Sequence, residues 1–143
     1  MSYWDSIEAA YNGVSIHDGA IVFCRDFARL PAAIGDLLAV HWTLSEVSNG
    51  GLHQFFLNST GVLAPEAAQG FDRMGLSNVG NLIRTAMSFF GETYPREQED
   101  REPFLISHAG EIFRPLEKTL YEVGSPNLDF IYDVMDNYAK RTA

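Results

Sequence analysis

Residues 46–61 read EVSNGGLHQFFLNSTG, which is the most distinctive segment of the chain. The paired Gly50 and Gly51 interrupt a helical pattern, because glycine loses the most backbone entropy when it becomes helical. Apolar residues at helical spacing precede the glycines, and a short aromatic segment with Phe55 and Phe56 follows them. The stretch therefore predicts a helix, a sharp turn, and a second short helix that presents aromatic rings to the core.

The polar residues of this stretch suit a structural corner. Asn49 can cap the turn that follows it. Gln54 and Asn58 lie four residues apart, so their amides can bond to each other or to nearby backbone. Buried amides need such partners. The predicted corner comprises Glu46, Asn49, Gly50, Gly51, Gln54, Phe55, Phe56, Asn58 and Ser59.

Upstream of the corner, apolar spacing predicts three helices. A first amphipathic helix begins near residue 3 and ends near residue 11. Residues 20–30 are ambiguous between strand and helix, and we favour a helix because Phe23 and Phe27 lie four residues apart. Pro31 can occupy the first turn of the third helix, which runs to the glycines.

Downstream, further helices are predicted from Pro65, from Ser77, around residues 116–123, and from Ser125-Pro126, where Ser125 would be the cap. Residues 92–102 are highly charged, and they predict an exposed turn and the start of another helix. The predicted fold class is all-α. We expect one compact domain over residues 1–143, with about six to eight helices and no substantial sheet.

The last predicted helix has two distinct faces. Its apolar face contains Leu128, Ile131, Tyr132, Met135, Tyr138 and Ala139. Asp129, Asp133 and Asp136 share another face, where carboxylates one turn apart have Cβ atoms about 5–6 Å apart, the scale of neighbouring DNA phosphates. We interpret these aspartates as a candidate acidic face for binding a partner. An ordinary solvated helix face, diluted by Lys140, is the alternative.

Composition limits the classes of function. The chain has 143 residues, of which 46% are hydrophobic, enough for a domain that needs no metal or disulfide. Nineteen acidic residues against ten basic residues give a formal net charge of −9. Nucleic acids and anionic membranes attract Lys and Arg, so direct binding to either is disfavoured. A basic protein surface is the partner that this charge attracts.

The expected location is the cytoplasm. No basic segment precedes an apolar run at the N-terminus, so a signal peptide is not predicted. No stretch approaches the roughly 18 uninterrupted apolar residues of a membrane-spanning helix. The single Cys24 suits a reducing compartment, and its apolar neighbours predict a position in the core.

The chain contains no recognisable catalytic motif, and we expect no catalytic residue, metal or cofactor. Its four histidines form no compact ligand pair of the His-Glu-x-x-His type. His53 can approach Glu46 across the glycine turn, which makes this pair the best candidate for acid–base or metal chemistry. A hydrogen-bonded histidine at the rim of the corner is the alternative.

The corner also resembles a bacterial helical family, long labelled a domain of unknown function, that includes a DNA-mimic protein. The family pattern is approximately Glu-Val-x-Asn-Gly-Gly-Phe-x-Gln-Phe-Phe-x-Asn-Ser-x-Gly, with Leu52 in place of the first Phe here. The resemblance extends well over residues 30–92 and loosely to the end. The matching positions are Glu46, Val47, Asn49, Gly50, Gly51, Gln54, Phe55, Phe56, Asn58, Ser59 and Gly61.

The resemblance implies an acidic, all-helical protein that self-associates, so we expect a homodimer. Its carboxylates would imitate DNA phosphates and occupy the DNA site of a basic regulator. The leading hypothesis is therefore an acidic protein-binding regulator without direct contact to nucleic acid or membrane. An immunity or antitoxin protein that neutralises a basic toxin is a second hypothesis. A small metal-assisted enzyme centred on Glu46 and His53 is a third.

Overall fold

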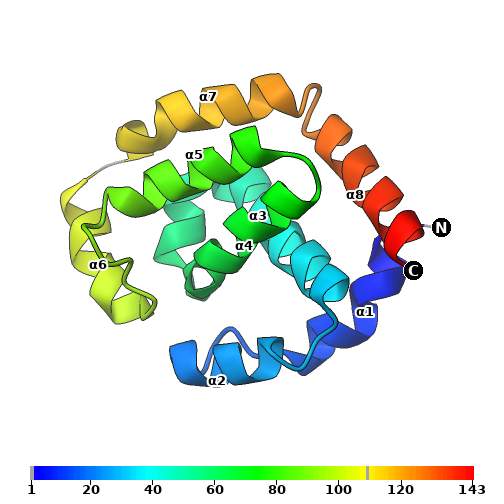
Figure 1. Cartoon of the computed structure of the whole chain (residues 1–143). Coiled ribbons are helices and arrows are strands. Elements are labelled where there is room, and N and C mark those ends of the chain that lie inside the picture. Colours follow the sequence, from blue (N-terminus) through cyan, green and yellow to red (C-terminus); the bar gives the residue numbers. More distant parts are fainter. Residues whose placement is uncertain (1, 109) are drawn as a thin grey trace.

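The longest helix, α3 (Ala32–Leu57), lies at the centre of the molecule, and the other helices surround it (Figure 1). The computed structural model describes residues 2–108 and 110–143. These residues form eight α-helices and no strand in one compact domain, which confirms the predicted all-α class. In chain order, the other helices are α1 (Trp4–Gly13), α2 (Gly19–Phe27), the 3-10 helix η1 (Ser59–Leu63), α4 (Ala64–Arg73), α5 (Ser77–Ser88), α6 (Gln98–Ser107), the 3-10 helix η2 (Gly110–Phe113), α7 (Arg114–Val123) and α8 (Asp129–Thr142).

α3 is buried on nearly all sides. Its residues are buried without a gap from Gly35 to Val40, and Trp42, Leu44 and Val47 are buried further along. A helix that is apolar all round belongs inside a domain. The main contacts of α3 are with α1, α4, α6 and α8 and with the 3-10 helices η1 and η2. Each of these outer α-helices contributes to the buried core, with Ile7 from α1, Phe71 from α4, Leu105 from α6 and Met135 from α8.

The predicted break at the glycines is confirmed. Gly50 and Gly51 have non-helical backbone angles inside α3, with φ −150° at Gly50 and φ +76° at Gly51. A positive φ favours glycine, because a side chain there crowds the backbone. A Cβ atom on Gly51 would also collide with the carboxylate of Glu117. Helical geometry resumes at Leu52, and the short second part of α3 leaves in a new direction.

Two local predictions were wrong. α8 begins at Asp129 and not at Ser125-Pro126, and Leu128 holds the capping position with φ +69° and no side-chain bond. The apolar face of α8 is nevertheless buried as predicted, apart from a half-buried Tyr132. Cys24 is exposed and not in the core. α2 packs mainly against η1, so it buries Phe23 but leaves the adjacent Cys24 outside.

Within the charged segment 92–102, the side chain of Arg101 is fully buried, which was not predicted from the sequence. The guanidinium donates to four backbone carbonyls. Nε donates to Phe56 O at 2.7 Å and Nη2 to Asn58 O at 2.9 Å, both at the C-terminal end of α3. Nη1 donates to the carbonyls of Pro95 and Arg96, in the segment that leads into α6. Burial lowers the pKa of Arg101.

None of the helices in the described part of the chain is both long enough and apolar enough to cross a lipid bilayer.

We predict that Arg101→Met lowers the free energy of unfolding by about 3 kcal/mol, because buried carbonyls lose their charged donor. Urea unfolding followed by circular dichroism measures this change. The exposed Arg114 provides the control, and Arg114→Met should change stability by no more than about 0.5 kcal/mol. Equal effects from the two substitutions would contradict the structural role of Arg101.

Candidate functional site

The corner is held together by Glu46. Its Oε2 atom accepts hydrogen bonds from Gln54 Nε2 at 2.7 Å and from Asn58 Nδ2 at 3.0 Å. The two amides therefore share one carboxylate and do not bond to each other. The turn at the glycines explains this arrangement, since it folds the short second part of α3 back towards Glu46. A charge-assisted bond to each amide is stronger than a bond between two neutral amides.

Glu117 takes the capping role that was predicted for Asn49. Its Oε2 atom accepts a hydrogen bond of 2.8 Å from the backbone N–H of Leu52, the first helical residue after the glycines. Asn49 is exposed. The amides at a helix N-terminus lack partners within the helix, and the helix dipole favours a negative charge there. A carboxylate from α7 thus stabilises the start of a helical segment that is distant in sequence.

The opposite end of the same segment is stabilised by Arg101. The last carbonyls of a helix lack N–H partners, and the helix dipole favours a cation beside them. Arg101 supplies both a donor and a positive charge at Phe56 and Asn58. A Cβ atom on Gly61 would lie 2.7 Å from this guanidinium, so glycine is needed for the close approach.

The aromatic residues of the corner face the core, as the sequence predicts. Phe55 and Phe56 are completely buried. The ring of Phe56 lies 5.2 Å from that of Phe90 in the turn after α5, and 5.4 Å from that of Phe113 in η2, measured between centroids. Aromatic contacts of this kind add stability beyond the burial of area. The corner is therefore joined to two later segments of the chain, the turn after α5 and η2.

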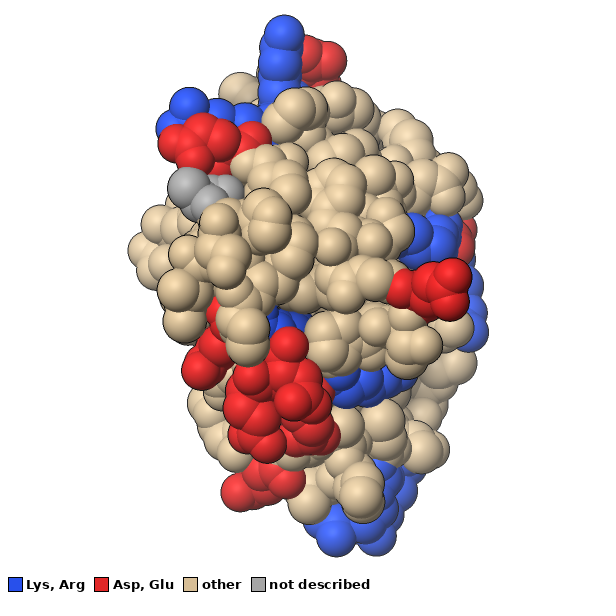
Figure 2. Space-filling model, turned by 90° about the vertical axis from the view of Figure 1, so that its left-hand side faces the viewer, with Lys and Arg blue, Asp and Glu red and all other residues tan. Residues whose placement is uncertain are grey.

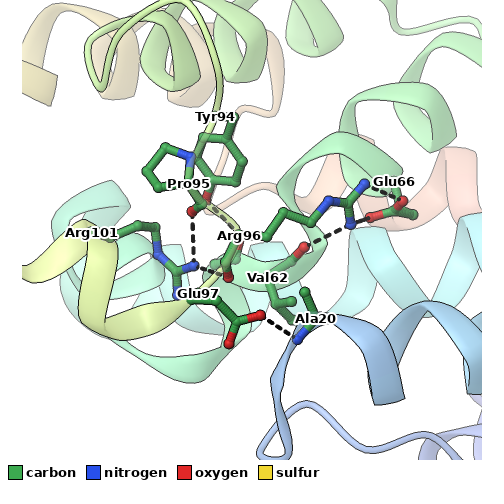
Figure 3. A network of polar contacts seen from close by, with 9 residues as sticks. Ala20, Val62, Glu66, Tyr94, Pro95, Arg96, Glu97 and Arg101 are labelled. Atoms are coloured by element: carbon green, nitrogen blue, oxygen red, sulfur yellow. Dashed lines mark hydrogen bonds and ion pairs between the residues drawn. The ribbon is translucent and has the colours of Figure 1, made fainter.

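A second polar network fixes the segment before α6 (Figure 3). Arg96 makes a two-bond ion pair with Glu66, with distances of 2.8 and 3.0 Å, and also donates to Val62 O. Glu97 accepts a 2.7 Å hydrogen bond from the backbone N–H of Ala20, at the start of α2. These contacts tie α6 to α4, η1 and α2, so the start of α6 has a fixed position.

An open cleft of about 510 Å³ lies beside the corner. Tyr11 and Trp42 contribute aromatic surface, and their ring centroids are 5.3 Å apart. Glu46 is the carboxylate of the lining, and none of the described residues that line the cleft is a lysine or an arginine. The remaining lining is mostly polar, with His17, Ser45, Asn58, Ser59, Thr60 and Gln98, and also includes Ile16.

His53 and Glu46 have separate partners in this structure. His53 Nε2 lies 3.2 Å from the backbone oxygen of Leu105 in α6, while Glu46 bonds to the two amides. The described residues contain no group of three or more His, Cys, Asp or Glu that could hold a metal ion.

The predicted acidic face on α8 is smaller than expected. Asp129 and Asp133 are exposed. Asp136 is half-buried, and its Oδ1 atom accepts a 2.7 Å hydrogen bond from the backbone N–H of Tyr3. This aspartate therefore ties the N-terminal segment to α8 and is not a free carboxylate. Two of the three carboxylates of this face are therefore exposed.

α8 itself is anchored by a buried aspartate of α3. Asp36 is 2% exposed, and it accepts hydrogen bonds from Tyr138 Oη at 2.7 Å and from Arg73 Nη1 at 2.6 Å. The sequence analysis did not identify Asp36. Asp36 directly precedes the apolar pair Leu37-Leu38 in the central helix, and this position was the sequence feature that could have indicated its burial.

A stronger acidic surface lies on α6, which the sequence analysis did not propose as a binding face. Glu99, Asp100 and Glu102 are exposed, and Glu97 precedes them at the start of the helix. Figure 2 views the side of the molecule on which α6 lies, and Asp and Glu side chains gather there in one patch. The clustering of four acidic residues within residues 97–102 was the signal in the sequence.

The hydrogen bond between Tyr138 and Asp36 makes the stability of the protein vary with pH in the alkaline range. Burial, followed by the bond to Asp36, raises the pKa of Tyr138 to about 12. The folded state therefore keeps this proton when an unfolded chain would lose it, so stability is complete below about pH 10 and falls as pH rises towards 12.

We predict that Tyr138→Phe makes this decline shallower in urea unfolding at pH 9 and pH 11 (about one unit on either side of the ordinary tyrosine pKa). The exposed Tyr121 is the control, and an equal change in Tyr121→Phe would contradict the assignment.

Comparison with known proteins identifies the family. The family model described as "DMP19-like protein" matches residues 28–141, which include the corner, α6 and all but the last residue of α8. The match extends beyond residues 30–92, where the sequence resemblance was strong. Neither the curated proteins nor the solved structures include a match to the chain. The expected family, which includes a DNA mimic, is confirmed, and the chain belongs to the DMP19-like proteins.

Proposed function

We propose that this protein is an acidic protein-binding regulator that occupies the DNA site of a basic DNA-binding protein. The observation that carries the proposal is a set of exposed carboxylates on two anchored helices, without an ion pair to any described residue, in a chain from a DNA-mimic family. The proposal includes no catalytic step. It places the protein in the cytoplasm, with its DNA-binding partner.

The distribution of cations supports this proposal. Five of the ten basic side chains form ion pairs with the protein's own carboxylates, and Arg101 is buried against carbonyls. A cation held in such a pair contributes little to the field seen by a partner. The ion pairs among the described residues are Arg25–Asp26, Arg73–Asp36, Arg84–Asp72, Arg96–Glu66 and Arg114–Glu111.

The surplus acids have a spacing suited to mimicry. Asp129 and Asp133 lie one helical turn apart on α8, so their Cβ atoms are about 5–6 Å apart. Glu99 and Glu102 are three residues apart on α6, which also places them on neighbouring turns. DNA carries phosphates at a comparable spacing along each strand. A surface that binds DNA phosphates with Lys and Arg therefore has matching partners on this protein.

A competition experiment tests the proposal. The protein is used to capture partners from its native host, and each basic DNA-binding protein recovered is bound to labelled DNA. We expect the unlabelled protein to displace the DNA and the displacement to weaken as salt rises, because screening reduces the attraction. Failure to displace DNA from every recovered partner would remove the support for mimicry.

The α8 carboxylates provide a second test. We predict that Asp129→Asn combined with Asp133→Asn weakens displacement by about threefold to tenfold, the range expected for losing two exposed ion pairs. Combining Glu8→Gln with Glu122→Gln removes the same charge from exposed positions on α1 and α7. Equal weakening by this control pair would show that only total charge matters.

Self-association remains a prediction from the family resemblance, supported by apolar side chains at the surface. Ile21 is 87% exposed and Ile106 is 80% exposed. We expect the protein to sediment as a homodimer at micromolar concentrations. A monomer throughout an ultracentrifugation series up to high micromolar concentration would contradict this expectation.

A further inference from the structure

The cleft beside the corner has an unusual set of hydrogen-bonding atoms. Glu46 uses Oε2 for both of its amide partners, and no hydrogen bond within the described part of the chain involves Oε1. No buried side-chain nitrogen or oxygen of the described residues lacks a partner. Oε1 of the half-buried Glu46 is therefore accessible to solvent. The cleft thus contains a carboxylate oxygen that is fixed in position and free to accept.

The amides of the cleft present acceptors in the same way. The NH₂ group of Asn58 donates to Glu46, and the NH₂ group of Gln98 donates to the backbone oxygen of Leu57 at 2.9 Å. A carboxylate or a carbonyl can only accept, so these bonds fix which end of each amide is the oxygen. The amide oxygens of Asn58 and Gln98 have no hydrogen bond with the described residues. Together with Glu46 Oε1, they give the cleft three unused acceptors.

The aromatic wall has a complementary property. Tyr11 is 38% exposed, and its ring packs at 36° to that of Trp42, which also lines the cleft. The faces of Trp and Tyr rings attract cations, and a planar guanidinium can stack on them. One carboxylate, two amide oxygens and two aromatic rings therefore surround a space of about 510 Å³ without a lysine or arginine in its described lining.

We infer that this cleft binds the guanidinium group of an arginine side chain. A guanidinium carries several N–H donors in one plane and accepts no hydrogen bond, which matches a lining of free acceptors. The acidic edge of α6 adds long-range attraction, since Glu97 and Glu99 line a hollow that shares His17, Ser59 and Gln98 with the cleft. Arg96 also lines that hollow, but Glu66 neutralises it.

This inference goes beyond the proposed function, because it concerns one cleft and does not require that the partner binds DNA. The two ideas can also fail separately. Displacement of DNA needs the partner protein, whereas binding in the cleft can be measured with the small probes alone.

The test is a titration of the full-length, isotope-labelled protein followed by nuclear magnetic resonance. The probes are N-acetyl-arginine-N-methylamide and the matching citrulline compound, which has nearly the same shape but no charge. We expect the arginine probe to bind in the millimolar range and to shift the signals of the Trp42 indole and the Asn58 amide. The citrulline probe should bind at least about tenfold more weakly, because it lacks a charge-assisted bond.

Variants locate the binding. Glu46→Gln should weaken arginine binding about tenfold, and Tyr11→Leu about threefold. Two residues on α7 provide matched controls that should leave binding unchanged. Glu122→Gln makes the same change at an exposed glutamate, and Tyr121→Leu makes it at a tyrosine that is 39% exposed. If Glu46→Gln fails to fold, the binding to Tyr11→Leu and the comparison of the arginine and citrulline probes still test whether the cleft binds a guanidinium.

The source of the guanidinium is resolved by adding free arginine as a third probe. Tighter binding of the capped compound assigns the site to an arginine residue of a protein, and tighter binding of free arginine assigns it to the amino acid. Either result supports the guanidinium site. Equal binding of arginine and citrulline probes, unchanged binding in both cleft variants, or no shift in the cleft would overturn it.

Discussion

The buried guanidinium of Arg101 joins the end of α3 to the segment before α6 through four backbone carbonyls. Burying a charge is unfavourable unless hydrogen bonds replace its water. Here backbone carbonyls from the end of α3 and from the segment before α6 replace that water. The same contact ends the central helix, orients α6 and fixes the chain between them. The acidic patch on α6 and the wall of the cleft that contains Gln98 both follow from it.

Charged side chains from other segments contact both ends of the short part of α3 after the glycines. The carboxylate of Glu117 lies at its N-terminus and the guanidinium of Arg101 at its C-terminus. Each charge is opposite in sign to the end of the helix dipole that it contacts, so both contacts are stabilising. A helix of this length is unstable alone, because nucleation costs more than a few hydrogen bonds return. Its position therefore depends on tertiary contacts. Because Glu46 also bonds to this segment, the geometry of the cleft depends on the same contacts.

Much of the fold could be predicted from the sequence, because it rests on local rules. Helical spacing and the breaks at Gly50 and Gly51 predicted the central helix and its turn, and the wheel of α8 predicted its buried face. The partners of polar side chains could not be predicted, since Glu117 and Arg101 meet the corner across more than 40 residues of chain. Arg101 was recognisable only as the charged member of the inward stripe that Phe104 and Leu105 continue on α6. Asp136 lies on the helix face predicted for it, but its carboxylate accepts a hydrogen bond from the backbone N–H of Tyr3 in the N-terminal segment.

Arg101 bonds only to main-chain oxygens, and this choice affects how the protein can evolve. Every amino acid carries a carbonyl, so replacement of the residues at positions 56, 58, 95 or 96 removes no acceptor. The arginine therefore has no side-chain partner whose identity must change with its own. Gly61 differs from these positions, because a side chain there would collide with the guanidinium, so correlated substitutions between homologues would link Arg101 to Gly61 and not to its carbonyl acceptors. Substitutions at these four positions therefore keep the hydrogen bonds of Arg101, whereas substitution of Arg101 removes all of them.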